Sequence, residues 1–100
     1  MEKEIELILA FRQGNEKAFL QLCDKYNALL DSLSNRYYSI CLDNGEKEDF
    51  LQESKIALCD AALGFDVENS KVTFGAYAKV CVRNRLVSYL RKCKAKKKAK

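Results

Sequence analysis

Basic and aromatic side chains are interleaved in one part of the chain, between residues 71 and 92. The cations there are Lys71, Lys79, Arg83, Arg85, Arg91 and Lys92, and the aromatic residues among them are Phe74, Tyr77 and Tyr89. Guanidinium and ammonium groups bind phosphates, and aromatic rings stack on nucleic-acid bases. This pattern therefore predicts a surface that binds nucleic acid by phosphate contacts and base stacking.

The net charge of the chain hides a strong asymmetry. Residues 71–100 carry eleven Lys or Arg and no Asp or Glu, whereas residues 1–70 carry seven basic and fourteen acidic residues. A net charge of +4 is thus the sum of a +11 part and a −7 part. The positive part acts on a polyanion over a Debye length of about 8 to 10 Å, which makes nucleic acid the leading partner. Alternatively, the lysines of residues 94–100 form only a solubilising tail.

The composition predicts a single all-α domain. One hundred residues with 48% hydrophobic content suffice for one core but not for two. The chain has no proline and only four glycines, so few positions would interrupt a helix. Its longest apolar run, residues 7–11, is too short for a signal peptide or a membrane span. We therefore expect a compact bundle of about four helices in a cytoplasmic protein without a membrane partner.

Neither a metal site nor an enzyme active site is expected. The five cysteines form no Cys-x-x-Cys pair, and the chain has no histidine to complete a zinc site. Histidine is also the commonest general base, and neither a glycine-rich phosphate loop nor a nucleophile elbow occurs. The sequence thus predicts a protein without catalytic residues, metal or cofactor. It leaves open whether Cys81 is redox sensitive or only a small hydrophobic residue.

Apolar residues at three- and four-residue steps indicate the first two helices. The first is expected over residues 2–13 and ends at Gly14, after which Asn15 can cap the second. The second helix carries one continuous core stripe, formed by Phe19, Leu22, Cys23, Tyr26, Leu29, Leu30, Leu33 and Tyr37.

The third helix follows a turn at residues 43–46 and is expected over residues 48–64. Its core side holds Phe50, Leu51, Leu58, Ala61 and Ala62, with Phe65 just beyond its end. The other side holds Asp49, Gln52, Glu53, Ile56, Asp60 and Leu63. Ile56 and Leu63 are apolar where solvent is expected. They are either ordinary scattered exposed residues or part of a polar-rimmed docking site for another protein.

The fourth helix is expected over residues 74–92, after a polar loop at residues 66–71 and a cap at Thr73. At 100° per residue, its core side holds Gly75, Ala78, Val82, Leu86 and Tyr89. The opposite side holds Tyr77, Val80, Cys81, Asn84, Val87, Ser88 and Arg91. Cations border this side, with Lys79 and Arg83 along one edge and Arg85 and Lys92 along the other. Such a face can read base edges with its amide and apolar groups while the cations hold phosphates.

Two successive helices carry a specific series of motifs. The series is Asp49-Phe-Leu-Gln-Glu53, Ile56-Ala-Leu58, Ala61, Phe65-Asp66, Phe74-Gly-Ala-Tyr-Ala78 and Val82-Arg83. In content and order it resembles region 2 of bacterial RNA polymerase sigma factors, and the upstream helices resemble that family more loosely. The resemblance implies a helical bundle of the sigma region 2 type with a non-enzymatic role in transcription initiation.

The resemblance also implies a partner for each outward face. In the family, the helix matching residues 48–64 docks on the clamp helices of the largest subunit of the polymerase, which implies core-polymerase contacts by Asp49, Gln52, Glu53, Ile56 and Asp60. The next helix recognises the minus-ten promoter element and captures flipped bases of the non-template strand. This implies DNA contacts by Phe74, Tyr77, Lys79, Val80, Cys81, Arg83, Asn84, Val87 and Arg91. Phe74 and Tyr77 would be the stacking aromatics, and Asn84 and Val87 sit where the family reads the upstream edge of the element.

The chain departs from the family pattern at two places. Val80 and Cys81 stand where housekeeping sigma factors carry a tryptophan pair, which favours an alternative sigma factor similar to the sporulation sigma-H group. Ser54 follows Gln-Glu where the family usually has glycine, a small-for-small change. We expect one helical domain over residues 1–93, followed at residues 94–100 by a basic tail or the start of a linker to a second domain. The sequence leaves open whether an anti-sigma factor is a further partner.

Two other functions fit part of the pattern. A small repressor or an RNA-binding domain would need the basic helix, but it would have no need of an outward Gln52, Glu53 and Ile56. A protein adaptor with a solubilising tail would need neither Phe74 nor Tyr77 for stacking. The docking stripe and the two aromatic residues thus separate the three functions.

Overall fold

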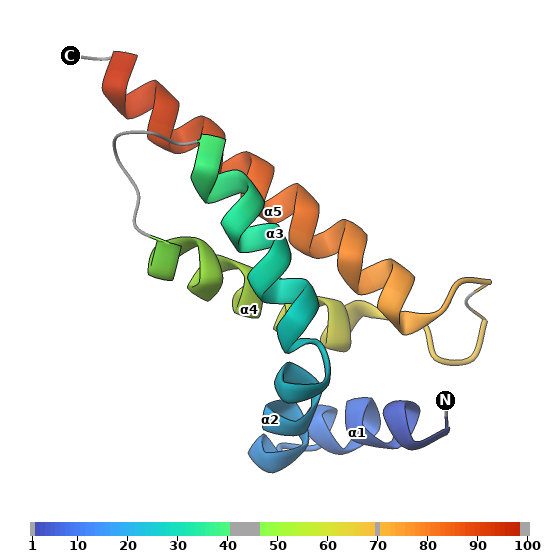
Figure 1. Ribbon diagram of the computed structural model, residues 1–100. Coiled ribbons are helices and arrows are strands. Elements are labelled where there is room, and N and C mark those ends of the chain that lie inside the picture. Colours follow the sequence, from blue (N-terminus) through green and yellow to red (C-terminus); the bar gives the residue numbers. More distant parts are fainter. Residues whose placement is uncertain (1, 41–46, 70, 99–100) are drawn as a thin grey trace.

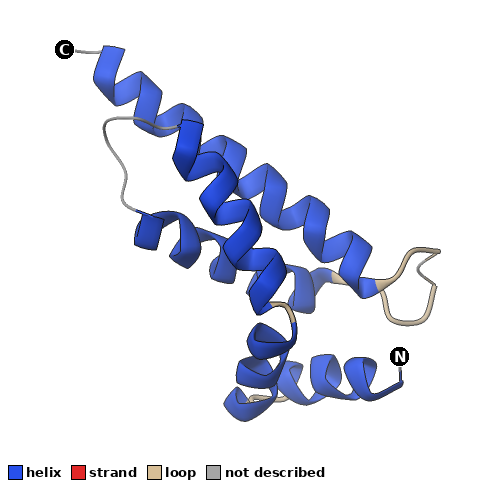
Figure 2. Cartoon of the chain, in the orientation of Figure 1, coloured by secondary structure: helices blue, strands red, loops and turns tan. Residues whose placement is uncertain are grey.

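Five helices and no strand make up the part of the chain that the structure, a computed structural model, describes (Figure 1, Figure 2). The structure describes the backbone of residues 2–40, 47–69 and 71–98. It describes the side chains of these residues except those of residues 2, 3 and 93–98. The helices are α1 (Glu2–Arg12), α2 (Glu16–Lys25), α3 (Asn27–Ile40), α4 (Lys47–Gly64) and α5 (Phe74–Lys98). The all-α prediction is confirmed, whereas the expected number of about four helices is wrong. The turn predicted at residues 43–46 lies outside the described residues. Among the helices that the structure describes, none combines the length and the apolar composition that a membrane span requires.

The corner between α1 and α2 forms as the sequence predicts. Gly14 has a φ of +99°, a left-handed conformation that glycine adopts without steric cost. Asn15 caps α2, because its side chain accepts a hydrogen bond from the backbone N–H of Ala18 at 3.3 Å. The rings of Phe11 and Phe19 stack across the corner with their centroids 4.8 Å apart. Packing and capping together fix the direction in which α2 leaves α1.

A break at Tyr26 divides what the sequence predicts as one second helix into α2 and α3. Tyr26 has φ −101° and ψ 12°, outside the α-helical region. Its hydroxyl donates a hydrogen bond to Glu4 of α1, and its ring packs edge-on against Phe74 of α5, with centroids 5.7 Å apart. The backbone of α5 comes close to this side chain, since a Cβ on the next residue, Gly75, would lie 3.4 Å from the Tyr26 hydroxyl oxygen. Contacts from distant parts of the chain therefore accompany a break that no local signal marks.

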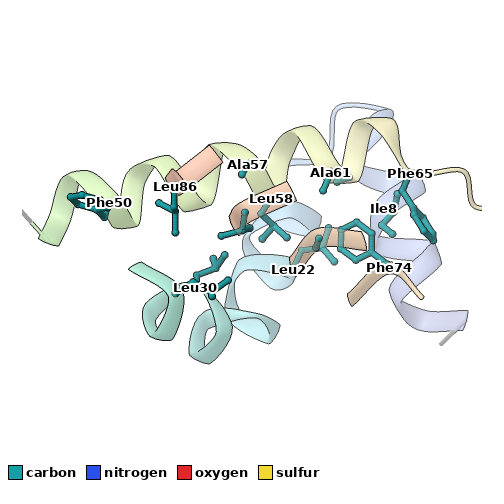
Figure 3. Close-up of a cluster of buried hydrophobic side chains, with 14 of the residues drawn as sticks. Ile8, Leu22, Leu30, Phe50, Ala57, Leu58, Ala61, Phe65, Phe74 and Leu86 are labelled. Atoms are coloured by element: carbon teal, nitrogen blue, oxygen red, sulfur yellow. The ribbon is translucent and has the colours of Figure 1, made fainter. Parts of the chain in front are cut away.

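The long helix α5 packs along α4 and α3 (Figure 1). One core of buried side chains fills the space between the helices, and ten of these side chains are labelled in Figure 3. The predicted core sides of the third and fourth helices are confirmed at Phe50, Leu58, Ala61, Ala62, Phe65, Ala78, Val82 and Leu86. Tyr89 is only half-buried, and α5 continues to Lys98, past its predicted end at residue 92.

Ser54 is fully buried on α4 at the position where the family pattern has glycine. Its Oγ donates a hydrogen bond to the backbone carbonyl of Leu51 at 2.6 Å, so the buried hydroxyl has a partner. A buried hydroxyl without a partner would cost about 1 to 3 kcal/mol. The core thus accommodates serine here without that cost.

Candidate nucleic-acid interface

The outward side of α5 is an exposed surface made of cations, an amide and small apolar groups. Lys79, Arg83, Asn84 and Arg91 are exposed, as is Val80, whose exposed fraction is 51%. Val87 is half-buried on the same helix. Because Ala78, Val82 and Leu86 turn inward, the residues between them turn outward along one helix, as the periodicity predicts.

A polar groove of about 460 Å³ lies where this surface meets α3. It is lined by Tyr37, Arg83, Asn84, Val87, Ser88 and Arg91. In the described part of the chain, neither arginine has an ion-pair partner, so both guanidinium groups are available to an anion. The sequence assigns Tyr37 to the core stripe and so misses it as a site residue, because helical spacing does not show which neighbour a half-buried ring faces.

Asn84 and Ser88 form a ridge on α5 that lines this groove on one side and a second groove on the other. The second groove is also polar, has a volume of about 310 Å³ and lies towards α4. It is lined by Glu53, Asn84, Arg85, Ser88, Tyr89 and Lys92. Within it the Nε of Arg85 donates to Oε1 of Glu53 at 3.0 Å, and Nη1 of Arg85 lies 3.5 Å from Oδ2 of Asp60. Arg85, predicted as a border cation of the DNA face, is therefore paired with two carboxylates that were expected to contact another protein.

Tyr77 is half-buried at the N-terminal end of α5. Its ring packs against Phe65 with centroids 5.4 Å apart, and its hydroxyl oxygen lies 3.3 Å from where a Cβ on Gly64 would stand. The Cys81 thiol one turn further on raises the pKa of the Tyr77 hydroxyl above its ordinary value of 10.0, and burial adds to the effect. The side chain is thus a neutral phenol held against the end of α4, with part of its surface open.

Phe74 is not presented to solvent, and the expectation that it stacks on a base is wrong for this structure. Only 4% of its surface is exposed. Its ring lies between Tyr26 and Phe65, at centroid distances of 5.7 and 5.4 Å. Figure 3 shows Phe74 beside Phe65 in the core. A ring enclosed on these sides cannot receive a base without unpacking the core.

Cys81 is half-buried and packs against the core, whereas its neighbour Val80 is exposed. The two positions predicted as a pair on the DNA face thus differ in accessibility. Only Val80 projects fully from the helix, so these two positions provide a small aliphatic surface at this point of α5.

Most of the predicted docking stripe is exposed on α4. Asp49, Gln52 and Asp60 are exposed, while Glu53 is half-buried beside Arg85. The exposed fractions of Ile56 and Leu63 are 43% and 53%, which places both apolar side chains at the surface with polar residues around them. The helix phase predicted for residues 48–64 is therefore confirmed.

Helix α1 braces the end of α4 that carries Phe65. Arg12 donates from Nε to the carbonyl of Ala62 at 2.9 Å and from Nη2 to the carbonyl of Phe65. A guanidinium at the C-terminus of a helix satisfies carbonyls that lack intrahelical partners. Beside this contact lies an apolar pocket of about 410 Å³, lined by Glu4, Ile5, Tyr26, Phe65, Val67, Val72, Thr73, Phe74 and Gly75.

Residues 24–96 match the family model of sigma-70 region 2, which is well over half of the chain. The chain belongs to the sigma-70 region 2 family. Members of this family have a sigma factor role in polymerase binding and promoter melting, and the family is non-enzymatic. Comparison with curated proteins found no match, and comparison with solved structures found none.

In this sigma-70 region 2 domain, every residue assigned to the two faces lies inside the matched segment. The brace formed by α1 does not, because the match begins only at residue 24, near the end of α2. No group of His, Cys, Asp or Glu side chains in the described ranges could hold a metal ion. The candidate site therefore consists of cations, amides, hydroxyls and rings on α3, α4 and α5.

Proposed function

We propose that this domain is the part of an alternative sigma factor that binds core RNA polymerase through α4 and the minus-ten promoter element through α5. The observation that carries the proposal is the arrangement of two outward faces on adjacent packed helices. One face is apolar with a polar rim around Ile56, and the other is basic with an amide at its centre. A protein that brings polymerase to DNA needs both faces at once.

On the polymerase side, the proposed contacts are Asp49, Gln52, Glu53, Ile56 and Asp60, and the proposed partner is the pair of clamp helices of the largest subunit. Ile56 supplies apolar area at the centre, where burial contributes most to affinity. The carboxylates on the rim favour a partner surface that carries cations. We propose that the protein acts in the cytoplasm, and an anti-sigma factor could compete for the same stripe.

On the DNA side, the proposed contacts are Tyr37, Tyr77, Lys79, Val80, Arg83, Asn84, Val87 and Arg91, with Cys81 as a packing residue behind them. Arg83 and Arg91 are available for backbone phosphates, and Asn84 between them can offer its amide to a base edge. Tyr77 is the ring proposed to stack on a flipped base of the non-template strand. Stacking of this kind contributes about 1 to 3 kcal/mol per base.

The assignment to an alternative sigma factor of the sigma-H type depends on Val80 and Cys81. A tryptophan pair at these positions would offer two large rings to unstacked bases. Here one side chain is a small exposed aliphatic group and the other packs inward. We therefore propose a domain that opens a narrow set of promoters and depends on Tyr77 for base capture.

Pull-down with bacterial core RNA polymerase tests the proposal. Ile56→Asp should abolish detectable capture, because it places a charge at the apolar centre of the docking stripe. Leu20→Asp is the matched control: Leu20 is an apolar residue of α2 that is 65% exposed and lies outside the stripe, so capture should persist. Both variants should retain the helical circular dichroism spectrum. If the unmodified domain captures no polymerase, a nucleic-acid-binding regulator that recruits none is favoured. Equal capture of all three proteins would show instead that Ile56 is not part of the docking surface.

A further inference from the structure

Arg85 is a cation of α5 whose guanidinium is held by two carboxylates of α4. Its Nε–Oε1 distance to Glu53 is 3.0 Å, and its Nη1–Oδ2 distance to Asp60 is 3.5 Å. The two helices lie side by side over this stretch (Figure 1). The side chain of Arg85 is 37% exposed and that of Glu53 is 25% exposed, so the pair is accessible from solvent without being freely mobile.

The three residues of this cluster belong to two different surfaces. Glu53 and Asp60 are members of the docking stripe of α4. Arg85 lines the smaller polar groove with Ser88 and Lys92, on the flank of the ridge that faces nucleic acid. The ion pairs therefore connect the surface proposed for one partner to the surface proposed for the other.

We propose that Arg85 is shared between the two interfaces. In the free domain Glu53 and Asp60 hold it, and when cationic side chains of the polymerase take these carboxylates, the guanidinium turns to a backbone phosphate of single-stranded DNA. This inference rests on the proposed function and adds a residue that contributes to DNA binding only after docking. A guanidinium binds carboxylate and phosphate with the same fork of donors, so the exchange needs only a change of side-chain rotamer.

The strength of the contacts sets the size of the effect. Partly exposed ion pairs contribute little to stability, because water and salt screen them and two long side chains lose freedom. Exchange of the partners of Arg85 therefore costs little free energy. We expect that binding of one partner raises the affinity for the other by about three- to fivefold. Coupling of this kind is reciprocal: polymerase raises the affinity for DNA by the same factor by which DNA raises the affinity for polymerase.

Arg85→Gln separates this role from a structural one. The affinity for core polymerase and for a fluorescent oligo-dT strand is measured by anisotropy, with the domain free and in complex with core. We expect Arg85→Gln to bind core about three- to fivefold more tightly, since Glu53 and Asp60 no longer have an internal partner. The complex should bind the strand more weakly than the unmodified complex, while the affinity of the free domain for the strand hardly changes.

Lys92→Gln is the matched control, because Lys92 is a cation of the same groove and has no ion-pair partner in the described ranges. It should weaken strand binding in both states and leave the affinity for core unchanged. Arg85→Lys keeps the charge but not the fork, so its affinity for core should lie between those of Arg85→Gln and the unmodified domain. This variant also serves if Arg85→Gln fails to fold.

The outcomes that overturn the proposal are distinct. If the unmodified domain binds core and the Arg85 variants bind it equally well or less well, Arg85 is not shared and serves only to join α4 to α5. If the unmodified domain binds no core at all, the proposed function itself is wrong and the sharing of Arg85 falls with it.

Discussion

The ring of Tyr77 rests on the ring of Phe65, with centroids 5.4 Å apart and planes inclined by 46°. Phe65 packs edge-on against Phe74, and Phe74 against Tyr26, so four aromatic rings form a continuous row from the break between α2 and α3 to the surface of α5. Only the last ring of the row is proposed to meet DNA. The others hold it in place, which lowers the entropy lost when a base stacks on it.

Base capture should depend on the ring of Tyr77. We expect Tyr77→Ala, in complex with core polymerase, to lose about 1 to 3 kcal/mol of binding free energy for a single-stranded minus-ten oligonucleotide. The loss on random duplex DNA should be much smaller, because phosphate contacts dominate there. Fluorescence anisotropy measures both. Tyr77→Phe keeps the ring and should bind nearly as well as the unmodified domain; equal losses on the two ligands would contradict base capture.

Phe74 should contribute to the free energy of unfolding of the domain, because its ring is part of the core. Replacing it by alanine leaves a cavity beside Tyr26 and Phe65, and changes of this type cost about 3 to 5 kcal/mol. Urea denaturation followed by circular dichroism gives the free energy of unfolding. Leu20→Ala, at an exposed position of α2, should change that free energy by less than about 0.5 kcal/mol. A Phe74→Ala variant of unaltered stability would show that the ring is not part of the core.

Salt should report on the groove between α3 and α5. Each neutralised phosphate of a single strand contributes about −0.7 to the slope of log affinity against log salt concentration. The double variant Arg83→Gln, Arg91→Gln should therefore reduce the magnitude of that slope by about 1.4 on a single-stranded oligonucleotide. Substituting Lys17 and Arg36, two exposed cations that lie outside this groove, should leave the slope unchanged. Variants that lower affinity at every salt concentration with an unaltered slope would place the phosphates elsewhere.

The carboxyl group of Glu4 should make stability depend on pH. Burial acts to raise its pKa, but hydrogen bonds from Lys25 and Tyr26 outweigh burial and hold the pKa below the ordinary value of 4.5. A depressed carboxyl pKa stabilises the fold above that ordinary value and loses its effect as pH falls through the folded value. Glu4→Gln should thus lower the free energy of unfolding by about 1 kcal/mol at pH 7, measured by urea denaturation.

The effect of the same substitution should be smaller at pH 3 than at pH 7, because the contribution of Glu4 declines as pH falls from 4.5 towards its folded pKa. Asp31→Asn is the control, because its pair with Lys47 spans 3.4 Å between two exposed side chains. It should change stability little at either pH. A constant difference between Glu4→Gln and the unmodified domain at both values would show that size, not charge, matters at this position.

Sequence periodicity was sufficient to predict the buried and exposed sides of helices that pack against the core along their length. On α4 and α5 the buried residues recur at helical spacing, so the core sides and the outward position of Ile56 could be predicted. The motif series identified the family for the same reason, since it lies on these two helices. The position of Asn84 on the outward ridge also follows from phase alone.

Periodicity failed where a contact between distant residues decides the structure. Nothing local marks the break at Tyr26, which lies in an apolar stripe without glycine or proline. Phe74 is the first residue of its helix, so its burial depends on the ring of Tyr26 and on the path of the loop before it. Arg85 has the position predicted for it, but its partners are on another helix, and a single sequence does not show that they meet.

The contact between Arg12 and the end of α4 bears on how promoter preference could be moved from one protein to another. The segment that carries the family pattern starts after α1, yet the carbonyls of Ala62 and Phe65 are held by a residue before it. A chimaera that exchanged only residues 24–96 would inherit Tyr77, the ring proposed to capture a base, without the Arg12 contacts that hold the end of α4. We therefore expect that a transplant of the proposed promoter specificity needs α1 as well as the segment that carries the family pattern.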